Sequence, residues 1–230
     1  QIRSSVFGNT LVSLPFLNYG GLLCQDDATG RILLDAAADL NSALGTSHVE
    51  LRHTTRIWQG LQTRQHKVTM VAKMAADADI QWRTFDTKLR NQIRKAEKSG
   101  LDAVEGHLDL LDGFYEVLAR NMRDLGSPIH SKSFFRSVLE EFPQSTKLLA
   151  ITIDGKFIAA GLICWLGDTI EIPWASSIRE YNTFCPNNLL YWNAIRFAIG
   201  KGIKNFDFGR STPNEGTYKF KKQWGAVPVQ

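Results

Sequence analysis

The fold is decided by residues 168–226, which read DTIEIPWASSIREYNTFCPNNLLYWNAIRFAIGKGIKNFDFGRSTPNEGTYKFKKQWGA. An apolar, strand-like segment at the start of this stretch runs into a polar loop between Arg179 and Asn188. A helix of about fifteen residues follows, an ordinary length in globular proteins. A second strand, Asn205 to Phe208, then opens into a Gly/Ser/Thr loop. This order predicts a βαβ unit, in which ligands bind beyond the carboxyl ends of the strands, near the helix N-terminus.

The composition is that of a chain that folds around a packed core. Its 230 residues, 43% of them hydrophobic, are enough for one large domain or two small ones. No apolar run reaches the length of a membrane span, since the run Phe157 to Leu166 has only the length of a strand. The chain begins without Met and without a signal-like leader, and we expect it to be a fragment trimmed at both ends.

The cysteines indicate a reducing compartment. Cys24, Cys164 and Cys185 are far apart, form no CxxC pair and have no histidine at a spacing typical of metal sites. An odd number of cysteines without a disulfide framework is typical of reducing compartments. We therefore expect a cytoplasmic protein with buried thiols and no bound metal.

Positive charge gathers in two segments, although the formal net charge is only +4. The first is a predicted helix over residues 82–99, whose basic residues are Lys88, Arg90, Arg94, Lys95 and Lys98. The second contains Lys219, Lys221 and Lys222. The two clusters could face one polyanionic ligand, such as a nucleotide, a lipid pyrophosphate or tRNA, or they could be two solvated faces.

The rest of the chain alternates between helical and strand-like periodicity. Residues 31–44 have the apolar spacing of a helix that ends at a glycine. Two further helices are expected between residues 109 and 142. Three strands should follow, over residues 148–153, 157–166 and 169–176.

Pro173 lies inside the last of these strands. Proline cannot donate to the hydrogen-bond ladder of a sheet, so we expect a bulge or a splayed edge there. A break at this point would open a cleft between this strand and the Asn205–Phe208 strand. From residue 109 the expected order is helix, helix, strand, strand, strand, helix, strand. It resembles the order of the GNAT acyltransferase fold, an α/β (α+β) fold whose mixed twisted sheet has splayed central strands.

A closer resemblance is carried by several short runs. They are Arg90–Ala96 (RNQIRKA), Pro173–Ser177 (PWASS), Tyr181-Asn182, Pro186–Trp192 (PNNLLYW), Phe206–Ser211 (FDFGRS), Gly216–Ala226 (GTYKFKKQWGA) and residues 14–21 (LPFLNYGG). Together they closely resemble the FemAB-like proteins of the GNAT superfamily. More narrowly, they are similar to FemAB-related proteins with a BioF2-like acetyltransferase domain, associated with PEP-CTERM/exosortase and exopolysaccharide gene clusters. The resemblance implies tandem GNAT-like domains, with the remainder of the first over residues 1–80 and the second over residues 81–230.

This resemblance implies an N-acyltransferase or aminoacyltransferase. Fem enzymes use aminoacyl-tRNA to extend the stem peptide of a peptidoglycan precursor, and related members are associated with acyl-CoA and polysaccharide synthesis. The implied donor is therefore acyl-CoA or aminoacyl-tRNA, with no permanently bound cofactor. The implied acceptor is an amine-bearing sugar or peptide precursor of the cell envelope or of an exopolysaccharide. The chain departs from both patterns, because it has neither the long helical hairpin arm of tRNA-binding Fem enzymes nor the usual GNAT pyrophosphate loop, whose place residues 179–188 occupy.

Two residues are expected to be catalytic. Acylation of an amine needs an uncharged nucleophile, a held carbonyl and stabilisation of the oxyanion. In Fem-type enzymes the lysine that matches Lys221 is thought to stabilise an anionic ligand or intermediate. Strand alternation turns Asp207 away from the phenylalanines on either side of it. Asp207 could take a proton from the amine, or it could pair with Arg210 or Lys221.

Substrate-binding side chains are expected near the same strand ends. Arg179 and Tyr181 could bind a donor phosphate or an acceptor carboxylate, for which a guanidinium offers two-pronged geometry. Asn187 and Asn188 could bind substrate, although one of them could instead cap the following helix. The remaining expected binding residues are Trp174, Trp192, Arg210, Ser211 and Lys219, of which Trp192 could equally be core.

Two alternatives to an enzyme remain open at this point. One is a non-catalytic GNAT scaffold that binds a polysaccharide or a lipid-linked precursor. The other is a nucleic-acid-binding protein that uses the basic helix of residues 88–98, which would make binding steeply salt-dependent and indifferent to Asp207→Asn.

Overall fold

The computed structural model describes residues 1–5, 8–15, 17–53, 58–64 and 66–229. The described chain divides into an N-terminal unit, up to residue 65, and a C-terminal unit over residues 66–229. In the N-terminal unit β1 (Ile2–Ser4) pairs antiparallel with β2 (Gly8–Val12), which pairs parallel with β3 (Val49–Glu50). The unit's helix is α1 (Asp27–Ala43), where the Asp26 side chain caps the backbone N–H of Thr29.

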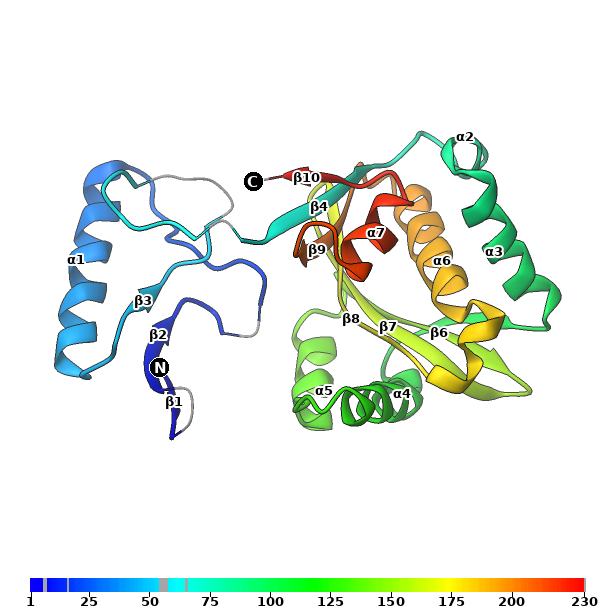
Figure 1. Ribbon diagram of the computed structural model, residues 1–230, viewed down its shortest axis with the longest axis horizontal. Coiled ribbons are helices and arrows are strands. Elements are labelled where there is room, and N and C mark those ends of the chain that lie inside the picture. The colour runs from blue at the N-terminus through cyan, green and yellow to red at the C-terminus, as the bar shows by residue number, and fades with distance from the viewer. Residues whose placement is uncertain (6–7, 16, 54–57, 65, 230) are drawn as a thin grey trace. The chain divides into compact units, whose positions relative to one another are not determined.

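The C-terminal unit is built on a seven-stranded sheet with the order β10-β4-β9-β8-β7-β6-β5 (Figure 1). The strands are β4 (Val68–Lys73), β5 (Asp102–Gly106), β6 (Thr146–Ile153), β7 (Lys156–Leu166), β8 (Thr169–Ser177), β9 (Asn205–Ser211) and β10 (Val227–Val229). Strands β8 and β9 run parallel, and the other neighbouring pairs run antiparallel. Because β4 lies in this sheet, the compact unit begins before the expected boundary at residue 80. The assignment of residues 1–80 to the remainder of a GNAT-like domain stays a prediction.

Helices cover both faces of this sheet, as Figure 1 shows. The helical segments are α2 (Ala78–Thr84), α3 (Thr87–Lys98), η1 (Leu108–Leu110), α4 (Leu111–Asp124), α5 (Lys132–Glu141), η2 (Arg179–Phe184), α6 (Pro186–Gly200) and α7 (Gly216–Lys222). One apolar core lies between the sheet and α3, α6 and α7, and a second lies between the sheet and α4 and α5. Burying apolar residues on both faces explains why the central strands read as nearly continuous apolar runs.

The expected single helix over residues 82–99 is wrong. The structure has two helices, because Phe85 adopts an extended conformation after α2 and Asp86 begins a new helix. The Asp86 carboxylate accepts the backbone N–H of Leu89 at 2.6 Å, which is an N-cap. The break leaves the Phe85 ring buried in the core and starts α3, with its basic residues, from a fixed end.

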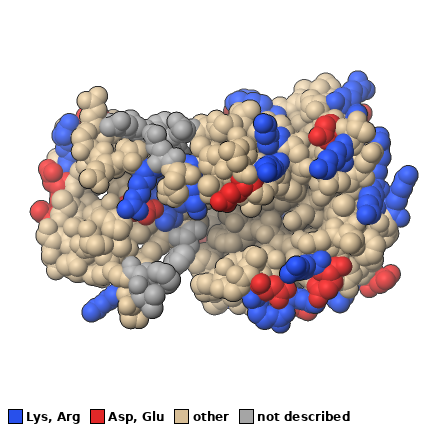
Figure 2. Space-filling model, viewed as in Figure 1, with Lys and Arg blue, Asp and Glu red and all other residues tan. Residues whose placement is uncertain are grey.

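The two parallel strands diverge where Pro173 was expected to break the sheet. The pairing of β8 with β9 runs from Thr169↔Asn205 to Glu171↔Asp207 and goes no further. On the other side of β8, Leu162 pairs with Trp174 while Cys164 pairs with Glu171, so β8 has one extra residue at Ile172-Pro173. The expected bulge and divergence are confirmed. Figure 2 shows this face hollowed along β7 and β8, between α4–α5 and the region of β9 and α7.

Candidate active site

A lysine held by two carbonyl groups lies where the strands diverge. The ammonium group of Lys221 on α7 donates to the backbone oxygens of Gly209 and Arg210, at 3.1 and 3.0 Å. Successive carbonyls of a regular strand point to opposite sides, so one amine cannot usually reach both. Here Gly209 has a φ of 72°, and β9 carries a bulge opposite Thr69–Val71. Glycine adopts this left-handed conformation at little cost, and the bulge lets both oxygens face Lys221.

Two carboxylates lie side by side in the same region. Asp207 is 7% exposed, and its carboxylate accepts the backbone N–H of Gly209 at 2.6 Å. Asp207 of β9 lies opposite Glu171 of the parallel strand β8, and Glu171 lies opposite Cys164 of β7. The rings of Phe206 and Phe208 both contact Tyr191 of α6. Asp207 therefore faces the other side of the sheet, as strand alternation predicted.

Burial and these carboxylates set the protonation of the site. Burial lowers the pKa of Lys221 to about 8, while the negative charges of Asp207 and Glu171 partly oppose this shift. Burial, together with Glu171 and Asp207, raises the pKa of the Cys164 thiol to about 12. Lys221 is therefore mostly cationic at neutral pH but can lose its proton slightly above it. Cys164 stays a neutral thiol and is a poor nucleophile.

Binding of an anion beside Lys221 is expected to be coupled to proton uptake. An anion favours the charged ammonium and raises its pKa from about 8. Above this pH the free protein must gain a proton as it binds the anion, so affinity should fall by up to about tenfold per pH unit. Calorimetric titration at about pH 9, in two buffers that differ in ionisation enthalpy, measures this uptake. Lys221→Met should abolish it, and an unchanged proton count in that variant would contradict the assignment.

Several buried polar atoms near the strand ends lack a hydrogen-bond partner among the described residues. They are Oδ1 of Asn187, Nε of Arg210 and Oγ of Ser211, which come from the first turn of α6 and the end of β9. Unpaired buried polar atoms are uncommon because each costs free energy. Two of these atoms lie at the end of β9 and one in the first turn of α6, which makes them candidate ligand contacts.

The expected asparagine cap of α6 is wrong. Cys185, in a left-handed conformation with φ 59°, occupies the N-cap position, and no side chain caps the helix. Asn188 is buried, and its amide donates to Oε1 of Gln92 on α3 at 3.3 Å. The two asparagines therefore have different surroundings. Asn187 keeps an unpaired oxygen, and Asn188 ties α6 to α3.

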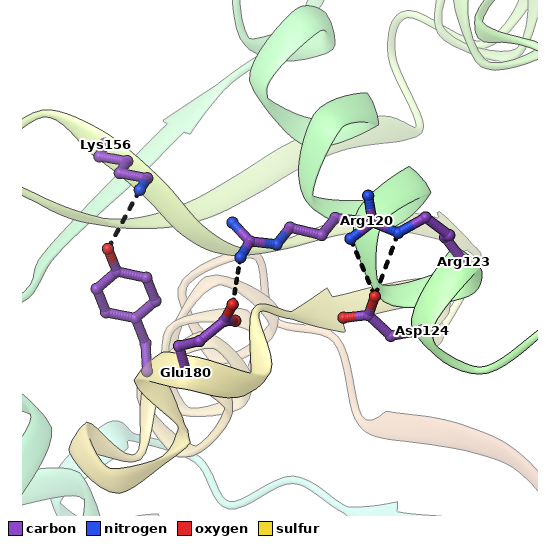
Figure 3. Close-up of polar contacts among 6 residues, drawn as sticks. Arg120, Arg123, Asp124, Lys156 and Glu180 are labelled. Carbon is purple, nitrogen blue, oxygen red and sulfur yellow. Dashed lines mark hydrogen bonds and ion pairs between the residues drawn. The ribbon is translucent and has the colours of Figure 1, made fainter.

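The polar loop between β8 and α6 is a short 3-10 helix, η2, tied to the sheet and to α4 (Figure 3). Glu180 forms an ion pair with Arg120 of α4. Lys156 donates to the hydroxyl of Tyr181 at 3.2 Å and lies 5.5 Å from the centre of its ring. Arg179 on the same turn is exposed. These contacts fix η2 in place and leave the Arg179 side chain to solvent.

The structure separates the other expected binding residues. Trp174 packs against Phe134 and Phe135 of α5, on the side of β8 that faces α4 and α5. Trp192 is 7% exposed and packs against Trp82 and Phe85, which makes it a core residue. Lys219 is exposed on α7. Glu171 was missed, although a carboxylate between Ile170 and Ile172 in a strand was a usable signal.

No group of three or more His, Cys, Asp or Glu within the described ranges is arranged to hold a metal ion. In the same ranges, the helices are all too short or too polar to cross a membrane.

A mixed sheet whose central parallel strands diverge, with polar groups at the divergence, defines a GNAT-type fold. Residues 83–222 match the family of the acetyltransferase (GNAT) domain, and the chain belongs to this family. The expected fold is thereby confirmed, and the predicted class of acyl-transferring enzyme is confirmed at the level of the family. Beyond this family, the chain is similar to Fem-type proteins in sequence and in fold.

The chain is 28% identical over 94 residues to the lipid II:glycine glycyltransferase of Staphylococcus haemolyticus, a match over 38% of this chain and 22% of that protein. It is 22% identical over 111 residues to the same-named protein of Staphylococcus epidermidis, over 45% of this chain and 25% of that protein. The chain therefore covers about a quarter of these relatives. The crystal structure of FemX is similar in fold, with a TM-score of 0.67 and 15% identity over 94% of this chain and 80% of that one. L-PGS from Bacillus licheniformis has a TM-score of 0.61 and 12% identity over 88% of this chain and 71% of that one.

Proposed function

We propose that this protein transfers an acyl or aminoacyl group to an amine of a cell-envelope precursor. The observation that carries the proposal is Lys221, held by two carbonyls beside the diverging strands of a GNAT-family sheet. The relatives named lipid II:glycine glycyltransferase support an aminoacyl donor and a peptidoglycan-type acceptor. An exopolysaccharide precursor, which the narrower sequence resemblance implies, is the other acceptor within this proposal.

The proposed chemistry forms a C–N bond and breaks the ester bond of an aminoacyl-tRNA or the thioester bond of an acyl-CoA. The uncharged amine attacks the carbonyl carbon, and negative charge develops on the carbonyl oxygen. The ammonium of Lys221 stabilises this charge in a partly buried position, where electrostatic stabilisation is stronger than in water. The carboxylate of Asp207, which is only 7% exposed, accepts the proton that the attacking amine loses. The departing hydroxyl or thiol group finally receives a proton.

Substrate binding is proposed for the polar groups around this position. Asn187, Arg210 and Ser211 offer unpaired buried atoms, and the exposed Arg179 is placed to meet a phosphate or carboxylate at the rim. Substrate contacts are also proposed for Tyr181, Asn188, Trp174 and Lys219, although their side chains have other surroundings. Trp192 is left out because its ring is packed in the core.

The donor is proposed to be acyl-CoA or aminoacyl-tRNA, both of which are polyanions. Figure 2 shows Lys and Arg side chains gathered on the side of the C-terminal unit that carries α2 and α3. None of the basic residues of α3 forms an ion pair with a described acidic residue. A basic surface of this kind favours a long polyanion. The cytoplasm remains the proposed location, with Cys24, Cys164 and Cys185 as free thiols.

The proposal is tested by the ligands that stabilise the protein. At fixed protein concentration, thermal unfolding is measured with acetyl-CoA, with an aminoacyl-tRNA mimic and with a UDP-linked cell-wall precursor. A ligand at a hundred times its dissociation constant should stabilise the folded state by about 2.7 kcal/mol. The stabilisation should be lost in Lys221→Met. Binding of a precursor without transfer to it from either donor would favour the non-catalytic scaffold, and stabilisation by no ligand would sink the proposal.

A further inference from the structure

A second polar pocket lies in the C-terminal unit, between β5, β6 and β7 and the end of α6. Its volume is about 420 Å³, within the range of small-molecule sites. Its lining residues are Gly106, His107, Asp109, Pro143, Gln144, Thr146, Lys147, Trp165 and Lys201. Two of these are lysines, one is a carboxylate, and arginine is absent from the lining.

The two lysines of this pocket are held in place by one pair of aromatic rings. The ammonium of Lys201 lies 4.9 Å from the ring centre of Trp165 and 5.5 Å from that of Phe197. The ammonium of Lys147 lies 5.1 Å from the ring of Phe197. The rings of Trp165 and Phe197 themselves contact each other, with centres 5.2 Å apart. Lysine side chains are ordinarily mobile. Because the rings already position both lysines, less side-chain entropy is lost when an anion binds.

The charges of the pocket favour an anion. Lys147 pairs with Glu105 at 2.9 Å, but Lys201 has no acidic partner in the described part of the chain. Lys201 lies directly after the last turn of α6 and is exposed. The carboxylate of Asp109 is occupied by the backbone N–H of His107 at 2.6 Å. The enclosed Nε2 of His107 has no hydrogen-bond partner among the described residues.

This pocket is separate from the site at Lys221. Asn187 and Cys185 mark the first turn of α6, whereas Lys201 follows its last turn. Fifteen residues of helix separate them, which corresponds to about 22 Å at 1.5 Å per residue. A ligand in this pocket therefore does not contact the diverging ends of β8 and β9.

We propose that this pocket binds the phosphate group of a small phosphorylated molecule. The ammonium of Lys201, with that of Lys147 on the same pair of rings, can meet a phosphate oxygen, which lysine binds as a point charge. A carboxylate is bound best by the bidentate guanidinium of an arginine, and no arginine lines this pocket. Asp109, Gln144 and Thr146 line the same space and suit the hydroxyl groups of the rest of such a molecule.

The test uses inorganic phosphate as the probe and the indole N–H signal of Trp165 in NMR as the reporter. This signal is assigned by its loss in Trp165→Phe. Phosphate should shift it saturably, and acetate at the same ionic strength should not. Lys201→Met is the decisive variant because Lys201 is exposed, so its replacement should leave the fold intact. It should weaken phosphate binding by at least about tenfold, the loss of one charge-assisted contact. Lys147→Met should weaken it similarly.

Two control variants make the outcome specific. Lys204 is exposed and pairs with Asp168 close to the same helix end, but it does not line the pocket. In Lys204→Met phosphate should shift the Trp165 signal as it does in the parent, and the same holds for Lys221→Met, because Lys221 belongs to the other site. Equal phosphate binding by Lys201→Met and the parent would overturn the proposal, as would an unshifted Trp165 signal. Loss of binding in Lys221→Met alone would place the phosphate at the candidate active site instead.

Discussion

Lys221→Met is expected to lower the rate of acyl transfer by about a hundred- to a thousandfold, the usual effect of removing one group that stabilises an oxyanion. The loss should appear in kcat as well as in KM, because Lys221 meets the charge of the bound anion and, more strongly, the charge that develops in the transition state. Methionine retains a long apolar side chain, so packing around α7 should change little. Steady-state kinetics with the donor and acceptor identified by ligand stabilisation would measure the effect.

The matched control is the next residue along the chain. Lys222 is exposed on the same short helix and has the same charge, so Lys222→Met removes a lysine without removing the group beside Gly209. Its rate should stay within about twofold of the parent, as for ordinary surface substitutions. If the two variants lose activity equally, the role of α7 is general electrostatic attraction of a polyanion. If neither loses activity, Lys221 only supports the bulge of β9.

Asp207→Asn tests whether Asp207 is the base that takes the proton of the amine. The amide has nearly the shape of the carboxylate, and its oxygen can still accept the N–H of Gly209. It cannot take a proton, however, so transfer should slow by about a hundredfold or more if Asp207 is the base. The same change removes one of the charges that keep the pKa of Lys221 from falling further. The pH above which Lys221 is neutral should therefore move down, which a pH profile of anion binding would detect.

Local chemistry was enough to predict the divergence of the strands. A proline within an apolar strand cannot complete the ladder, and the extra residue at Ile172-Pro173 is the bulge that this predicts. Likewise, alternation along β9 placed Asp207 opposite to the two phenylalanines. These features depend on residues that are neighbours in the chain. Sequence periodicity determines them without knowledge of the tertiary fold.

Features that depend on register or on distant contacts could not be predicted. Glu171 meets Asp207 only because β8 and β9 pair in one particular register. Lys221 reaches two carbonyls only because Gly209 adopts a positive φ and α7 folds back on β9. The helix break at Phe85 was also missed, since helical periodicity continues across it and a buried ring decides the outcome. Tertiary packing overrides local preference at such points.

Trp224→Ala is expected to destabilise the C-terminal unit by about 3–5 kcal/mol, the typical cost of removing a buried aromatic side chain. Trp224 follows α7 and is fully buried. Its ring lies 5.4 Å from Phe85 and 6.1 Å from both Tyr191 and Phe220, so it joins α7 to α6 and to the residue that separates α2 from α3. Denaturant unfolding, followed by circular dichroism, measures the change in midpoint at constant slope.

Two companion variants show whether the effect comes from packing. Nε1 of Trp224 has no hydrogen-bond partner among the described residues, so Trp224→Phe loses part of the ring but also removes an unsatisfied buried N–H. It should cost only about 1–2 kcal/mol, well below the alanine variant. Phe142 is 57% exposed, so Phe142→Ala should change stability by no more than about 0.5 kcal/mol.

Because Lys221 precedes Trp224 by less than one helical turn, the folded Trp224→Ala variant should also bind anions more weakly. Retention of both stability and anion binding in Trp224→Ala would mean that α7 is held by its own contacts with β9, and that the aromatic core does not position the lysine.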